Sequence, residues 1–257
     1  MRSITLILIV LILFIFFNHD IFAQVNIERF RAGEDSTGFS GYIEIELSSR
    51  TGNVDITEID IENQNNYLWK DMNTLFVIRS NFGWEEGKRF SNEALTHLRH
   101  IFRIKTSFQP EFFAQIDYNK EILLSFRGLV GGGVRLVIYK GKKTRFFWGT
   151  AFMFEHEKLD TNGNDKQEKT VDIIRWSNYI SAYININERA QLTWTTYLQP
   201  YINNFKDIRI LSDTDLIVGL SKYLSLAVGF RTRYDIQPPE EITSLDTALK
   251  TGLVLNF

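Results

Sequence analysis

Apolar and polar side chains alternate one residue at a time along most of the chain. At its end Leu253, Leu255 and Phe257 share one parity with the leucines and threonines before them, whereas the residues between them are mostly small or charged. Successive side chains of a strand point to opposite faces, so this period of two predicts strands with one apolar and one polar face. The stretches 191–202 and 224–235 alternate in the same way, and none of them has a helical period.

About twelve such segments follow one another. They cover residues 39–50, 54–63, 67–81, 90–104, 108–118, 122–139, 144–157, 169–186, 190–203, 206–220, 222–235 and 243–257.

The connections between these segments tend to alternate in length. One set is short throughout, as at Asn63–Asn66 and Lys140–Lys143, whereas the other set holds every long polar connection. The long connections are Asn81–Arg89, Leu159–Glu168 and Ile236–Ile242. The second set also contains three short connections, so the alternation is imperfect. This rhythm is typical of successive hairpins that have long loops at one end only.

Alternation alone fits both a soluble β-sandwich or lipocalin-type barrel and a transmembrane barrel. Three features favour the membrane: segments longer than an average strand, arginines in mid-strand such as Arg99, Arg127 and Arg175, and long connections on one side only. With an even strand count and both ends in the periplasm, every long loop falls outside. We therefore predict an all-β fold, an antiparallel up-and-down transmembrane β-barrel of about twelve strands over residues 39–257.

The beginning of the chain has the layout of a secretory signal peptide. A positively charged start precedes an apolar run at 4–17, which is shorter than the roughly 20 residues that span a bilayer. A small residue, Ala23, stands before Gln24, where a signal peptidase would cleave. We expect residues 1–23 to be a cleaved signal and 24–38 to be a periplasmic tail.

Composition narrows the classes further. The 257 residues include no cysteine, so neither a disulfide framework nor a thiolate metal site is available. The net charge of −2 does not favour nucleic acid, and no cofactor motif is present. No apolar run after the predicted signal is long enough for a transmembrane helix. We therefore expect an exported protein of the outer membrane of a Gram-negative bacterium, in contact with its lipid.

The parity that turns apolar side chains to lipid turns many charged ones to the interior. The predicted lumen lining comprises Glu44, Glu46, Arg99, Arg127, Arg135, Arg145, Glu155, Glu157, Arg175, Asp213, Asp215, Arg231 and Arg233. The same parity adds further inward charges, including Asp60, Glu62, Glu93, Arg209, Asp246 and Lys250. Two interpretations stand: opposed charges neutralise a narrow, filled lumen, or an acidic wall faces a basic wall across a small-solute pore.

Two hairpins predict particular pairs. A basic turn between the sixth and seventh segments places Arg127 opposite or diagonal to Glu155 and Glu157. A tight turn before the eleventh segment places Asp213 near Arg231.

Candidate catalytic groups are few. The glycines at 128–133 are not followed by the helix or the lysine of a phosphate-binding loop, and we expect them to relieve crowding or permit curvature. A lipase on the outer wall needs an outward histidine beside an outward serine. His97 faces inward, His100 lies at the periplasmic half, and no outward serine is expected at the height of His156. Carboxylates at i, i+2 spacing are also ordinary for a polar strand face. We expect no enzymatic activity.

The last strand, with Leu253, Leu255 and a terminal Phe257, resembles the recognition signal that the barrel-assembly machinery reads in outer-membrane proteins. The resemblance implies this machinery as a partner. A closing strand must also pair with the first strand, because an unpaired edge in lipid leaves backbone groups unsatisfied.

Four stretches carry a more specific resemblance. SGYIEIELSSRTGNVD (Ser40–Asp55), LRHIFRI (Leu98–Ile104), EFFAQIDYN (Glu111–Asn119) and LVGGGVRLVIYKGKKTRFFWGTAFMFEHE (Leu129–Glu157) are similar to the salt-induced outer membrane protein family, a domain of unknown function. The resemblance implies a location and a fold, and it supplies no catalytic residues.

These observations predict a passive role. The barrel is either a narrow small-solute pore or a structural element of the envelope under osmotic or ionic stress, the latter implied by the resemblance. A docking or adhesion barrel would instead depend on the Leu159–Glu168 connection, and an outer-membrane lipase is the remaining alternative.

Overall fold

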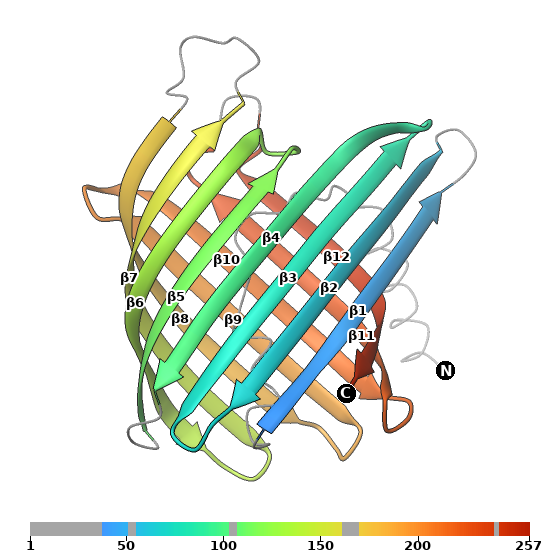
Figure 1. Cartoon of the computed structure of the whole chain (residues 1–257), viewed down its shortest axis with the longest axis vertical. Helices are drawn as coiled ribbons and strands as arrows, with labels where there is room; N and C mark the ends of the chain where they lie inside the picture. The colour runs from blue at the N-terminus through green and yellow to red at the C-terminus, as the bar shows by residue number, and fades with distance from the viewer. Residues whose placement is uncertain (1–37, 51–54, 103–106, 161–169, 239–241) are drawn as a thin grey trace, which may run out of the picture.

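The chain folds as one closed barrel, in which each strand pairs with the next and the last pairs with the first (Figure 1). The computed structural model describes residues 38–50, 55–102, 107–160, 170–238 and 242–257. The strands are β1 (Gly38–Arg50), β2 (Ile56–Leu68), β3 (Met72–Glu85), β4 (Lys88–Phe102), β5 (Phe108–Asn119), β6 (Leu124–Lys140), β7 (Thr144–Leu159), β8 (Thr170–Asn185), β9 (Ala190–Tyr201), β10 (Asn204–Gly219), β11 (Leu224–Asp235) and β12 (Leu245–Asn256). Every pairing is antiparallel, so the predicted fold class is confirmed.

The predicted signal peptide (1–23) and nearly all of the predicted tail (24–38) lie outside the described residues. Among the residues that are described, no helix is long and apolar enough to cross a membrane.

Side-chain exposure is the reverse of that in a water-soluble protein. Large apolar side chains lie on the outside, as for Phe112 with 61% of its surface exposed and Phe152 with 59%. Charged side chains lie inside, as for Arg127 with 2% exposed and Glu155 with 0%. An apolar outer surface around a polar interior is what a bilayer requires of a barrel, since only closure satisfies all backbone groups in lipid.

The turn between the second and third strands was predicted wrongly at Asn63–Asn66. β2 runs through these residues to Leu68, and the chain turns at 69–71. Asn65 Nδ2 donates a hydrogen bond to Asn63 Oδ1 on one face at 2.6 Å, whereas Gln64 and Asn66 are buried on the other. Asparagine is a turn signal only where its side chain replaces backbone bonds, and here the ladder to β1 supplies them.

The Asn81–Arg89 stretch is likewise not a long loop. β3 and β4 continue to a two-residue turn at Glu86 and Gly87, which have positive φ angles of 49° and 76°. Two successive residues with positive φ form the hairpin turn whose twist matches that of the strands, and Gly87 adopts it without steric cost. The two longest connections, between β7 and β8 and between β11 and β12, still share one end of the barrel.

Glycines in β6 relieve crowding, as predicted. A Cβ added to Gly133 would overlap the backbone carbonyl of Thr150, and one added to Gly131 would overlap the ring of Phe113. Close approach of a neighbouring backbone or ring is a common reason for glycine inside a strand.

The wall closes where β12 meets β1. The ladder joins four positions, Tyr42–Ile45 with Leu253–Asn256. Two further hydrogen bonds, each 3.0 Å, link the backbone amide of Gly41 to the carbonyl of Phe257 and the amide of Phe257 to the carbonyl of Gly41. The ring of Phe257 also stacks on Phe39 at 6.1 Å. The C-terminal residue is therefore part of the closing seam.

Candidate functional site

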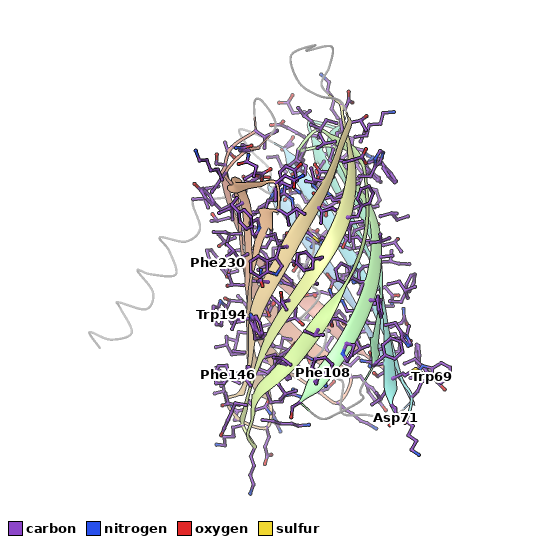
Figure 2. All side chains as sticks on the ribbon, turned by 90° about the vertical axis from the view of Figure 1, so that its left-hand side faces the viewer. Trp69, Asp71, Phe108, Phe146, Trp194 and Phe230 are labelled. Carbon is purple, nitrogen blue, oxygen red and sulfur yellow. The ribbon has the colours of Figure 1, made fainter. Side chains whose placement is uncertain are left out.

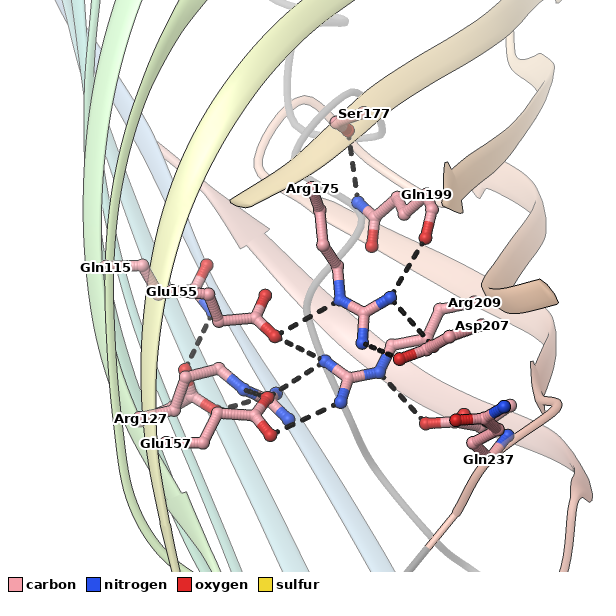
Figure 3. Close-up of polar contacts among 12 residues, drawn as sticks. Gln115, Arg127, Glu155, Glu157, Arg175, Ser177, Gln199, Asp207, Arg209 and Gln237 are labelled. Carbon is pink, nitrogen blue, oxygen red and sulfur yellow. Dashed lines mark hydrogen bonds and ion pairs between the residues drawn. The ribbon is translucent and has the colours of Figure 1, made fainter. Parts of the chain in front are cut away.

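A group of buried and half-buried charges crosses the lumen in the half of the barrel nearer the long connections (Figure 3). We call it the bridging cluster, and it comprises Asp117, Arg127, Glu155, Glu157, Arg175, Asp207, Arg209 and Asp235. Its members come from β5, β6, β7, β8, β10 and β11.

Arg209 on β10 is the centre of the bridging cluster. Its Nη1 donates to Glu155 Oε1 at 2.6 Å and to Glu157 Oε1 at 2.9 Å, both on β7. Its Nε donates to Asp235 on β11 at 2.9 Å. Since β8 and β9 separate β7 from β10 in the wall, the bonds to Glu155 and Glu157 run through the interior of the barrel.

Arg127 holds the other side of Glu157. Its Nε donates to Glu157 at 2.7 Å and its Nη1 to Asp117 at 3.3 Å. The ladder places Arg127 directly opposite Glu157, which confirms the predicted neighbourhood, with Glu155 on the diagonal.

Arg175 on β8 connects the cluster to the next part of the wall. Its Nε donates to Glu155 at 3.4 Å, and its two terminal nitrogens donate to the two oxygens of Asp207 at 3.0 and 3.3 Å. A further bond of 3.2 Å reaches the backbone carbonyl of Gln199. Paired contacts between one guanidinium and one carboxylate are the strong form of this interaction, and they fix the geometry of both groups.

Buried charges at this depth are stable only as a set. Arg127 and Arg175 are almost fully buried, and no more than 9% of the Arg209 side chain is exposed. Removing one partner of such a pair leaves an unpaired charge, whereas the intact pair contributes little net stability. The bridging cluster is therefore rigid in position but sensitive to any single substitution.

A second charged group lies between neighbouring strands and stays close to the wall. Arg231 on β11 pairs with Asp215 and lies 3.8 Å from Asp213, both on β10. The Asp213–Arg231 proximity was predicted, and the two residues face each other in the ladder.

A third group lies at the closing seam. Lys250 Nζ on β12 donates to Asp60 on β2 at 2.9 Å and lies 3.8 Å from Glu46 on β1. The hydroxyl of Tyr42 donates a hydrogen bond to Glu62 at 2.7 Å, and Glu44 faces Glu62 in the ladder. The carboxylates of β1 and β2 thus form the acidic part of the lumen.

The arginines of β4 and β6 have local partners. Arg99 pairs with Glu111 at 3.1 Å, and Arg135 donates to Gln109 at 3.2 Å. The guanidinium of Arg135 also lies 3.7 Å from the centre of the Phe147 ring. Planar guanidinium groups stack on aromatic faces in this way.

A cavity of about 1510 Å³ occupies the other half of the barrel, toward the short turns. We call it the chamber. Much of its lining is neutral and polar, including Gln64, Asn66, Gln191, Thr193 and Ser225. Its depth carries the carboxylates Glu44 and Asp215, and the short turns at its mouth carry Lys143, Arg189 and Lys222 with Glu188.

The residues predicted to line the lumen fall into these groups. Buried side chains are those of Glu44, Arg99, Arg127, Arg135, Glu155, Glu157, Arg175, Asp215 and Arg233, and half-buried ones are those of Glu46, Arg145, Asp213 and Arg231. Arg145 lies 5.1 Å from the ring of Tyr183, and Arg233 Nη2 lies 3.6 Å from Asp235. The predicted lining did not include Asp117 and Asp207, although Asp117 shares its parity with Gln115 and Asp207 shares its parity with Arg209.

Outside the lumen, one expectation about a serine is wrong. A register shift in β6 between Leu124 and Phe126 leaves both Ser125 and Phe126 exposed, near the height of His156. His156 Nδ1 lies 2.7 Å from Asp172, but the Ser125 hydroxyl donates to the backbone carbonyl of Lys158 at 2.8 Å. A bulge changes the side of the sheet to which the following side chains point. The alternation of residues along the chain therefore did not predict that Ser125 is exposed.

The other two histidines among the described residues have polar partners within the wall. His97 is buried with its Nδ1 3.0 Å from Gln115, and His100 Nδ1 lies 3.0 Å from the Thr74 hydroxyl. Over the described part of the chain, no three His, Asp or Glu side chains are grouped to hold a metal ion.

Comparisons with known proteins agree with this geometry. A family model described as "Protein of unknown function, DUF481" matches residues 43–257. The chain is similar to the structure of the NanC porin, with a TM-score of 0.51 and 9% identity over 85% of this chain and 98% of that one. It is also similar to the translocator domain of the autotransporter NalP from Neisseria meningitidis, with a TM-score of 0.52 and 7% identity over 90% and 93% of the two chains. No curated protein matches the chain. At these identities the likeness is one of fold.

Proposed function

Because the chain belongs to the DUF481 family of proteins of unknown function and forms an outer-membrane β-barrel resembling small porins, we propose that it is a narrow passive channel for small polar solutes. The observation that carries the proposal is the chamber of about 1510 Å³ inside the barrel, continued toward the other end by charged side chains. The bridging cluster is the constriction of this channel in its resting form.

The lining of the chamber supports a small, hydrogen-bonding solute. Amide and hydroxyl groups such as those of Gln64, Gln191 and Thr193 both donate and accept hydrogen bonds, so they replace the water around a polar solute. Because most charges at the mouth are cations and those in the depth are carboxylates, no single sign of charge attracts one kind of ion over the full length of the chamber.

The second candidate is a structural barrel of the envelope under osmotic or ionic stress. It is supported by the same bridging cluster, because ion pairs between β7 and β10 tie together parts of the wall that are not neighbours. On either proposal the protein is not an enzyme, and a porin-like barrel agrees with that.

Single-channel recording separates the two candidates. A channel with this constriction is expected to give small, uniform conductance steps after reconstitution in a planar bilayer, because the lumen lies between the filled barrels of eight strands and the open ones of sixteen or more. Heat-modifiable migration on a gel establishes in parallel that the sample is folded. Folded protein that gives no steps at any voltage rules out the channel and leaves the structural barrel.

We also infer that Phe257 takes part in assembly by the barrel-assembly machinery, supported by its place in the seam beside Gly41. Deleting Phe257 is expected to lower the amount of folded barrel in outer membranes several-fold, while refolding of the purified chain in detergent stays nearly unchanged. Leu245→Ala, at the opposite end of the same strand, is the matched control. Equal losses in membranes for both variants, or an equal loss in detergent, would contradict a role in recognition.

A further inference from the structure

The two ends of the barrel differ in charge. Among the described connections at the chamber end, five cations stand against two carboxylates, Asp71 and Glu188. The cations, which we call the basic collar, are Lys70, Lys142, Lys143, Arg189 and Lys222, and all are exposed. The described connections at the other end carry one cation, Lys120, against four carboxylates.

Exposed aromatic side chains stand next to the basic collar on the outer wall. Trp69 (51% exposed) precedes Lys70, and Tyr139 (55%) lies three residues before Lys142. Tyr223 (59%) follows Lys222, whose ammonium lies 5.0 Å from the ring centre. Figure 2 shows Trp69 and Asp71 at this end of the barrel.

The exposed aromatic side chains and the basic collar together match the depth profile of a bilayer. Tryptophan and tyrosine prefer the level where acyl chains meet headgroups, so the aromatic side chains mark the membrane boundary. Lysines one to three residues beyond that boundary then stand at the level of the headgroup phosphates, which their flexible stems can reach. These cations lie on four separate turns at one end of the barrel.

We propose that the basic collar binds the phosphate groups of anionic phospholipids in the leaflet around the chamber end of the barrel. Both described chain ends, β1 at Gly38 and β12 at Asn256, lie at this end, which is the periplasmic end if the termini are periplasmic as expected. The inner, phospholipid leaflet of the outer membrane surrounds the barrel there. Phosphatidylglycerol and cardiolipin are the ligand class, held as in the electrostatic binding of basic segments to anionic lipid.

Lys143, Arg189 and Lys222 also border the mouth of the chamber, so a free anion entering the lumen is the competing occupant. Lys70 and Lys142 do not line the chamber, but they belong to the same ring of cations. A ligand of the whole ring must therefore lie around the barrel, and a ligand of the chamber would be insensitive to Lys70 and Lys142.

The test uses a variant with Lys70→Gln, Lys142→Gln, Lys143→Gln and Lys222→Gln. The matched control replaces four exposed lysines nearer the other end, Lys88→Gln, Lys120→Gln, Lys158→Gln and Lys206→Gln, and removes the same charge. Native mass spectrometry of the detergent-solubilised barrels measures the preference for phosphatidylglycerol over phosphatidylcholine. With about fivefold affinity per lysine at low salt, the collar variant is expected to lose the preference at least tenfold. The control is expected to stay within twofold.

With phosphatidylglycerol as the probe, three results would overturn the proposal: equal loss in both variants, no loss in the collar variant, or displacement of the lipid by free glycerol phosphate at equal concentration. Binding of lipid A, the anionic lipid of the opposite leaflet, is measured separately for the same variants. A collar variant that loses lipid A but keeps phosphatidylglycerol also overturns it. None of these readouts depends on conductance, so a barrel that conducts nothing can still bind lipid in this way, and a collar that fails leaves the proposed channel untouched.

Discussion

Replacing Arg209, Glu155 and Glu157 together by serine should raise the single-channel conductance on the order of tenfold, toward that of a barrel with an unfilled lumen. These three side chains make the bonds that run between β7 and β10 through the interior. Serine removes most of each side chain and leaves a small polar group that water can solvate, so the constriction widens.

The triple substitution leaves the surrounding charges paired, which is why it should fold. Arg127 keeps Asp117 at 3.3 Å, and Arg175 keeps Asp207 at 3.0 Å. Asp235 keeps Arg233 at 3.6 Å. No buried charge loses its last partner, so the large penalty for an isolated buried ion does not arise.

The matched control for conductance is Arg231, Asp213 and Asp215 replaced together by serine. It also removes one arginine and two carboxylates from the interior, but these residues lie on neighbouring strands and stay near the wall. A conductance that rises equally in both variants would show that loss of charge, and not removal of the bridge, controls the current. An unchanged conductance in the triple variant would place the constriction elsewhere.

Arg209→Gln alone should lower the free energy of unfolding by about 3–5 kcal/mol, the cost of removing one partner from a buried ion pair. Glu155 and Glu157 would lose their common cation and repel each other in a site from which water is largely excluded. Equilibrium unfolding in urea, with the barrel in lipid vesicles, measures the change. Lys206→Gln, on the same strand but exposed, should change the free energy by less than about 0.5 kcal/mol.

A compensating substitution makes the Arg209 prediction more stringent. Adding Glu157→Gln to Arg209→Gln removes one of the two carboxylates that shared Arg209 and would repel each other without it, so part of the lost stability should return. A double variant that is as unstable as the sum of the two single variants would mean that the residues do not interact across the lumen.

Much of the wall could be predicted from the chain because alternation is a local property. The side chains of Leu253 and Leu255 are exposed and that of Val254 between them is buried, as the parity of the last segment requires. Pairs within one hairpin were predictable for the same reason. A short turn fixes the register, and the register alone sets Arg127 opposite Glu157.

Ends and irregularities of strands were less predictable. The asparagines at 63–66 continue β2, because a partner strand and a polar lumen satisfy side chains that would otherwise form a turn. Ser125 became exposed through a register shift that leaves no mark in the pattern of polar and apolar residues. In both places, pairing with the neighbouring strand outweighs the local preference of the residue.

Local alternation along the chain was enough to predict an antiparallel barrel, the apolar face of each strand, and most of the charges that lie inside. The folded barrel was needed to show that Arg209 reaches Glu155 and Glu157 across two intervening strands, and that a chamber lies at the other end. The physical reason is the distance along the chain over which each feature is determined. The face of a residue follows from its nearest neighbours along the chain, whereas contacts through the lumen depend on the number, tilt and stagger of all the strands at once.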